Sequence, residues 1–223
     1  MAVSLADAVA ATRTGDIWLF RGRSVPDRAI QLTTNSPVNH VGMALVIDDL
    51  PPLLWHAELG KSLPSQWSGK HQRGAQLHDL AAAVEVWRTK YGQRAWFRQL
   101  DPPATREMEN AALRTVARLD GTPFPSTAQL AWRWARGRVR GRLGPLGRLD
   151  RLGGKLGRLT RREQAALETA YCAEVVAVTY QAMGLLPAGT RPPSWYDPGT
   201  FWSGDRLDLQ GGYRLGDEIA IDP

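Results

Sequence analysis

The sequence predicts an α+β fold. Apolar or alternating runs over residues 40–47, 53–58 and 83–88 are typical of β-strands that bury one or both faces. Apolar residues recur at helical spacing over 105–119, and residues 169–180 read as a second helix. Strands and helices are therefore both expected to contribute to the core.

The remaining segments complete a coarse map of the chain. Residues 1–14 predict a short amphipathic helix, and residues 27–33 a second short helix ahead of the strand at 40–47. Residues 60–76 are polar and turn-rich, which predicts a surface loop. The proline- and aromatic-rich stretch 185–202 is expected to wrap irregularly over the core, and 213–221 to form a last short strand.

Length and composition fit one domain over residues 1–223, with a basic insertion at about 127–165. A single cysteine among 223 residues excludes an internal disulfide framework. No run of 18 apolar residues is present, and Asp7 interrupts an N-terminal run that no basic stretch precedes. We therefore expect neither a transmembrane helix nor a signal peptide, and a protein that is cytoplasmic or peripheral at the inner face of the membrane.

Cys172 is the first candidate for chemistry. The pattern places it in the first turn of the helix predicted over 169–180, where unsatisfied N–H groups and the helix dipole favour a thiolate. A lone cysteine also commonly fills space in a core, so position alone does not decide between nucleophile and packing residue.

A histidine at the start of a predicted strand gives this cysteine a possible partner. His40 precedes an apolar run, and in the next predicted strand His56 and Glu58 share one face through the period of two. A cysteine nucleophile needs a base that takes its proton and a third group that fixes the tautomer of that base. These three residues supply both roles.

Four segments resemble the circularly permuted NlpC/P60 enzymes. They are residues 15–20 (GDIWLF), 39–42 (NHVG), 55–58 (WHAE) and 171–176 (YCAEVV). That family comprises papain-like cysteine hydrolases, grouped with the YiiX- and YaeF-like proteins and more distantly with lecithin–retinol acyltransferase. The histidine precedes the cysteine in this chain, as in the permuted branch, and the resemblance covers roughly residues 14–126 and 166–215. It implies a papain-like fold in which an antiparallel sheet packs against the helix carrying the cysteine.

The resemblance also implies roles for individual residues. Cys172 becomes the nucleophile, its backbone N–H an oxyanion-hole donor, and His40 the general base and then acid. His56 falls at the position of the polar third residue, with Glu58 as the alternative for orienting His40. No cofactor is required. A metal site is not expected either, because His71 and His78 lack a nearby cysteine and the usual ligand spacing.

Residues 133–162 account for the net positive charge of the chain, because the remaining residues hold more acidic than basic side chains. They hold eleven basic residues and one acidic residue, Asp150, with leucines at helical spacing between the cations. Such a segment suits an anionic membrane surface, although its glycines and Pro145 oppose a stable helix in water. Alternatively, the leucines pack as a lid on the enzyme core. Nucleic acid is disfavoured because little besides Trp132 and Trp134 can stack on bases.

The predicted activity is thiolate attack on an amide or ester carbonyl, giving an acyl-enzyme that water or another acceptor resolves. The protein is then a cysteine hydrolase or acyltransferase, and the resemblance implies a cell-wall peptide or a lipid acyl substrate. The alternative is a catalytically silent papain-like domain that binds anionic membrane surfaces or a partner through its basic segment. The sequence does not indicate the oligomeric state.

Overall fold

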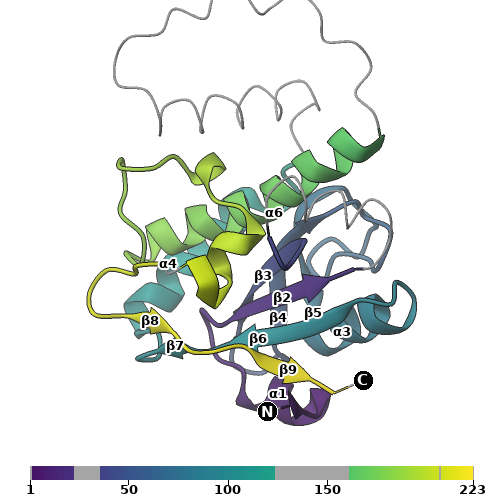
Figure 1. Cartoon of the computed structure of the whole chain (residues 1–223), viewed down its shortest axis with the longest axis horizontal. Coiled ribbons are helices and arrows are strands. Elements are labelled where there is room, and N and C mark those ends of the chain that lie inside the picture. Colours follow the sequence, from purple (N-terminus) through teal and green to yellow (C-terminus); the bar gives the residue numbers. More distant parts are fainter. Residues whose placement is uncertain (1, 23–35, 124–160, 206, 223) are drawn as a thin grey trace, which may run out of the picture.

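The computed structural model describes residues 2–22, 36–123, 161–205 and 207–222, with the side chains of 161–170 and 205 left out. A seven-stranded sheet is its central element (Figure 1). The strands in spatial order are β1 (Ala2–Val3), β9 (Ile219–Ile221), β6 (Arg94–Arg98), β2 (Ile17–Arg21), β3 (His40–Leu45), β4 (Leu53–Glu58) and β5 (Gly74–Asp79). All neighbours pair antiparallel except β1 and β9, which pair parallel.

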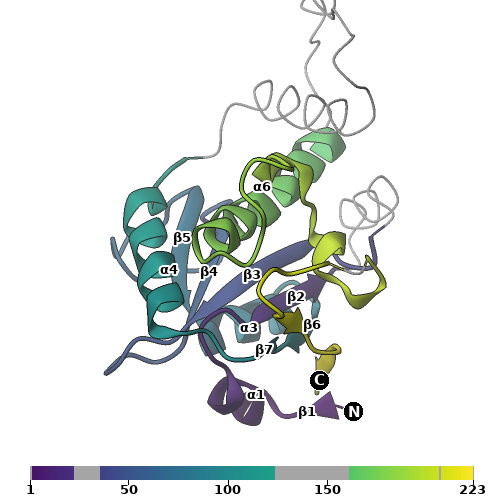
Figure 2. The ribbon, with the colours of Figure 1, turned by 90° about the vertical axis from the view of Figure 1, so that its left-hand side faces the viewer.

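Helices cover both faces of this sheet (Figure 2). On one face, α6 (Arg161–Ala182) packs on β3 and β4, and α4 (Arg106–Leu119) packs beside it. On the other face lie α1 (Leu5–Ala11) and α3 (Leu80–Thr89). The result is the α+β class predicted from the sequence, with a mostly antiparallel sheet packed against the helix that carries the cysteine.

Alternate residues of β3 and β4 belong to different cores. Val41 and Met43 join Trp55 in the core beneath α6, where the Trp55 indole N–H donates to Thr179 Oγ1 at 3.0 Å. Ala44 and Leu54 join the core beneath α3. The period of two therefore sends His40 and His56 to the α3 face.

Several predicted elements are confirmed. Strands β3 and β4 lie where the apolar runs at 40–47 and 53–58 predict them. The helix predicted over 105–119 is α4, whose N-cap Thr105 accepts a hydrogen bond from the backbone N–H of Met108. The stretch 185–202 has no long helix or strand, only the short 3-10 helices η1 (Pro193–Trp195) and η2 (Pro198–Phe201).

The strand predicted over 83–88 is wrong, because these residues belong to α3. Its buried residues are Leu80, Ala83, Val84 and Trp87, which is helical spacing, and the Asp79 side chain caps the helix by accepting from Ala82 N–H. The alternating pattern arises from Val84 and Val86 alone. The loop predicted over 60–76 ends early, since β5 begins at Gly74.

At the ends of the chain the predictions hold in part. The N-terminal helix is confirmed as α1, and β1 precedes it. The single strand predicted over 213–221 is two: β8 (Arg214–Leu215), paired with β7 (Leu100–Asp101), and β9 in the main sheet. A third 3-10 helix, η3 (Ser203–Asp205), follows η2.

Other predictions fall beyond the described ranges. The helix at 27–33 lies outside them, and so does the basic insertion, apart from its last residues at the start of α6. None of the helices within the described residues combines the length and the hydrophobicity needed to cross a bilayer.

Arg98 ties the C-terminal part of the chain to the sheet. Its side chain is buried and donates three hydrogen bonds to backbone carbonyls: Gly216 at 2.6 Å, Phe201 at 2.6 Å and Leu215 at 3.0 Å. Glu218 lies 3.7 Å from the guanidinium and balances its charge. One side chain at the end of β6 thus fixes both η2 and β8.

We predict that Arg98→Lys lowers the free energy of unfolding by about 2–4 kcal/mol, because an ammonium cannot reproduce the three-way fork and leaves buried carbonyls without donors. The matched control is Arg214→Lys, which alters an exposed pair with Asp101 and should cost less than about 1 kcal/mol. Urea denaturation measures both, and equal losses would contradict the role given to Arg98.

Candidate functional site

Cys172 lies well inside helix α6, not in its first turn. The helix begins at Arg161, so about three turns precede the thiol. The prediction of a helix starting near Thr169 is wrong on this point. Within a continuous helix the Cys172 N–H belongs to the i−4 hydrogen-bond ladder, so neither dipole activation nor an oxyanion hole at this N–H follows from the backbone.

The thiol is fully buried in the core beneath α6. Burial raises the pKa of Cys172 to about 12, and this outweighs the N–H groups of Val41 and Ala173, which favour the thiolate. The expected accessible, low-pKa thiol is therefore wrong for this conformation. At neutral pH the group is a protonated thiol.

Three of the four histidines of the chain form a hydrogen-bonded row on the opposite face of the sheet. His40 Nε2 lies 3.0 Å from His56 Nδ1, and His56 Nε2 lies 3.0 Å from His78 Nδ1. Adjacent strands β3, β4 and β5 supply one residue each. Their side chains meet because Leu54 pairs with His78 and His56 with Gln76, which places both histidines on the α3 face.

Aromatic side chains enclose this row. The Trp87 ring centroid lies 4.3 Å from that of His40 and 5.2 Å from that of His56, and Phe20 contacts His40 edge-on. Burial lowers the pKa of His40 to about 3 and that of His78 to about 4, and it lowers the pKa of His56 well below its usual value. All three rings are neutral at pH 7.

Neutral rings in a row must share one direction of donation, because each link needs one N–H and one lone pair. His78 Nδ1 already faces His56, and His78 Nε2 is buried without a hydrogen-bond partner among the described residues. The Leu63 carbonyl raises the pKa of His78, so it favours a proton on this ring. We infer that every ring carries its proton on Nε2. The Nδ1 atom of His40 is then a lone-pair acceptor, as a general base requires.

The row identifies which predicted residue orients His40. His56 does so directly, whereas Glu58 accepts a 2.6 Å hydrogen bond from Ser62 Oγ and takes no part in the row. Sequence reasoning missed His78, because it placed the start of β5 in a loop. The signal available was the period of two, which would have put Gln76 and His78 on the face of His56.

His40 and Cys172 approach the start of β3 from opposite faces of the sheet. The thiol accepts from the N–H of Val41, the residue next to His40, but among the described residues no hydrogen bond joins Sγ to the His40 ring. Pairing between β3 and β4 runs only from Met43–Trp55 onward. The ladder with β4 thus does not include Val41, and the Val41 N–H faces the sulfur of Cys172 instead.

A segment near the C-terminus covers this point. We call residues 193–202, which contain η1 and η2, the cover segment. It contacts both α6 and β3, and Asp197 within it contributes to the raised pKa of Cys172. The Arg98 guanidinium holds its end through the Phe201 carbonyl. The cover segment and the core together enclose the thiol.

Among the described residues, no group of three or more His, Cys, Asp or Glu side chains is arranged to hold a metal ion. Within the histidine row, four ring nitrogens already face one another in pairs.

Comparison with known proteins gives a limited result. No protein-family model matches the chain, and a search of curated proteins found no match. Among solved structures, the chain is similar to the metalloprotein YiiX of Escherichia coli O157:H7, with 17% identity, a TM-score of 0.46 and coverage of 94% of this chain and 88% of that one. YiiX belongs to the group that the sequence motifs resemble. We draw nothing about the site or the activity from this likeness, and the relationship to permuted NlpC/P60 enzymes stays a prediction.

The histidine row predicts a loss of stability in acid. Because the folded pKa values of His78 and His40 lie below the unfolded value of about 6.5, the unfolded chain binds more protons as pH falls. The contribution is complete above pH 6.5 and is lost between pH 6.5 and about 4 for His78. We expect His78→Asn to reduce the loss of unfolding free energy between pH 6.5 and 4.5 by roughly 2 kcal/mol.

Urea unfolding at a series of pH values measures this loss. The control is His71→Asn, which changes an exposed loop histidine. Its charge is only a minor cause of the lowered His78 pKa, so the slope should change far less than in His78→Asn. The slope is the readout, because His78→Asn also removes a hydrogen bond at every pH. Identical slopes in wild type and His78→Asn would show that His78 is not held neutral by burial.

Proposed function

We propose that this chain is a cysteine hydrolase or acyltransferase acting on an amide or ester bond, and that its site is closed in this conformation. The observation that carries the proposal is the place of the thiol: Cys172 Sγ meets the backbone N–H of Val41, directly beside His40. On its other side the His40 ring is fixed by His56 and, through it, by His78. The fold thus brings a nucleophile, a base and an orienting group to one end of β3, although the sulfur and the base lie on opposite faces of the sheet and must meet for thiol catalysis.

The proposed reaction uses His40 Nδ1 as the proton carrier. It takes the thiol proton as Sγ attacks the carbonyl carbon of the substrate, and it returns that proton to the leaving amine or alcohol. A thioester on Cys172 results. Water then attacks the thioester and yields an acid, or another nucleophile accepts the acyl group, with His40 again moving the proton. His56 and His78 are positioning residues in this scheme.

Movement of the cover segment is a requirement of the scheme. With the thiol pKa raised to about 12 and that of His40 lowered to about 3, burial opposes proton transfer between them. Exposure to water removes the larger cause of the thiol shift and returns the pKa of Cys172 towards its usual value of about 8.5. Trp87 covers His40 from the other face of the sheet, so the scheme also requires the His40 ring to leave that cover and reach the sulfur. Displacing residues 193–202, which contact α6 and β3, also uncovers the face of the sheet that carries the thiol.

A second candidate function is favoured by one observation, the burial of Cys172 in mid-helix. A thiol that only packs the core fits a catalytically silent domain, which would act by binding anionic surfaces through the basic segment at residues 133–162. Salt-sensitive sedimentation with anionic vesicles, together with no acyl transfer to the thiol, is the outcome expected from this alternative.

Mass spectrometry of the protein after incubation with p-nitrophenyl octanoate, phospholipid vesicles and muropeptides tests the proposal. We expect the mass of the acyl group on the peptide that contains Cys172, and no adduct in Cys172→Ala. His40→Ala should slow acylation by roughly 100- to 10,000-fold, because it removes the general base. His56→Gln should shift the pH profile of acylation through the altered tautomer of His40.

His71→Ala is the matched control, since it removes an exposed histidine outside the row and should acylate at the wild-type rate. Thermal unfolding of each variant shows whether a lost rate reflects lost folding. Acylation that is equal in wild type and His40→Ala, or that is absent with every substrate, would favour the silent domain.

A further inference from the structure

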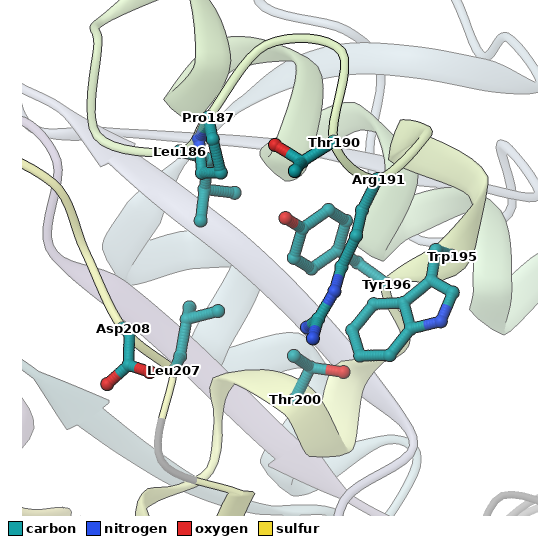
Figure 3. A pocket seen from close by; sticks show the side chains of 9 residues that line it. All are labelled: Leu186, Pro187, Thr190, Arg191, Trp195, Tyr196, Thr200, Leu207 and Asp208. Carbon is teal, nitrogen blue, oxygen red and sulfur yellow. The ribbon is translucent and has the colours of Figure 1, made fainter. Parts of the chain in front are cut away.

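A cavity of about 520 Å³ lies on the side of the cover segment formed by Trp195, Tyr196 and Thr200. The turn after α6 supplies Leu186 and Pro187 together with Thr190 and Arg191, and Leu207 and Asp208 complete the wall (Figure 3). Its volume lies within the range of about 300–1,000 Å³ that small-molecule sites occupy. Neither Cys172 nor any histidine of the row lies among its lining residues.

Two opposite charges line this cavity without pairing. The Arg191 guanidinium stacks on the Trp195 ring, 4.1 Å from its centroid, and extends into the cavity (Figure 3). Asp208 stands on the wall away from Trp195. Among the described residues, Arg191 and Asp208 form no ion pair with each other or with another side chain. The stacking on Trp195 holds the guanidinium in place and leaves its donors for a ligand.

Apolar side chains and hydroxyl groups line the cavity wall between Arg191 and Asp208. Leu186 is buried and Leu207 half-buried, and with Trp195 they offer an apolar surface. The hydroxyls of Tyr196 and Thr190 also line the cavity. A ligand that matches this wall carries an anion and a cation at its two ends and an apolar group between them.

We propose that this cavity binds a short peptide, with its carboxylate on Arg191, its ammonium group on Asp208 and an apolar side chain against Leu207. A planar guanidinium binds a carboxylate through two parallel hydrogen bonds, which an ammonium cannot do. A neutral lipid acyl chain would leave both charges unmatched. The site is therefore selective for a zwitterion of peptide size.

If the proposed function holds, this cavity would help to bind the substrate of the enzyme, and this step rests on that proposal. Tyr196 and Thr200 line it, while Asp197 between them acts on the thiol of Cys172. A peptide bound here would contact the cover segment directly through these residues. Binding itself requires no chemistry at Cys172, so the two proposals can be tested separately.

Isothermal titration with the dipeptide Ala-Leu, its C-terminal amide and its N-acetyl derivative tests the site. We expect Ala-Leu to bind, and both derivatives to bind roughly 10-fold or more weakly because each loses one charge-assisted contact. Arg191→Gln should weaken Ala-Leu by a similar factor and leave the amide unchanged. Asp208→Asn should likewise weaken the binding of Ala-Leu, because it removes the partner of the ammonium group, and should leave the affinity for the N-acetyl derivative unchanged.

Arg94→Gln is the matched control, because Arg94 is likewise exposed and stacks on a tryptophan, Trp96, at 4.9 Å, but lies outside the cavity. It should bind Ala-Leu as wild type does. Equal affinity for all three peptides, an Arg191→Gln variant that binds as tightly as wild type, or no binding at millimolar concentration would overturn the proposal. Cys172→Ala should bind Ala-Leu with the wild-type affinity. If Ala-Leu binds but no substrate acylates Cys172, the proposed enzyme activity is refuted while the peptide-binding site is supported.

Discussion

The packing of α6 across β3 and β4 is the constraint on which the rest of the structure depends. Trp55 and Thr179 join the helix to the sheet by a buried hydrogen bond, and the same contact brings Cys172 to the Val41 N–H. Because successive residues of a strand face opposite sides, a thiol that meets Val41 is necessarily beside His40 and on the other face of the sheet. The packing of α6 on the sheet therefore both buries the Cys172 thiol and brings it close to the start of β3.

The histidine row depends on the second core in the same way. Trp87 of α3 packs over His40 and His56, and this apolar cover keeps the rings neutral and aligned. A row of neutral imidazoles can transmit a tautomer choice from His78 to His40, which charged rings in mutual contact could not do. The protein thus holds a protonated thiol and a neutral imidazole at the start of β3, on opposite faces of the sheet.

Much of this arrangement could be predicted from local patterns. The runs at His40 and His56 gave both strands and their shared face, and the motif resemblance paired His40 with Cys172. The position of Cys172 within its helix was missed although residues 161–168 (RREQAALE) are all good helix formers, because the predicted basic insertion extends to about residue 165. His78 was missed because the residues before β5 are polar, and α3 was taken for a strand from two valines. The burial of the thiol depends on residues 193–202, whose path no periodicity encodes.

The rate at which iodoacetamide alkylates Cys172 at low urea concentrations tests most directly whether the thiol is closed off by a movable segment. If the cover segment opens locally, little surface is exposed, and the rate should be nearly independent of urea well below the unfolding transition. Labelling whose urea dependence matches that of global unfolding would contradict this account, because the thiol would then be reached only when the whole domain unfolds.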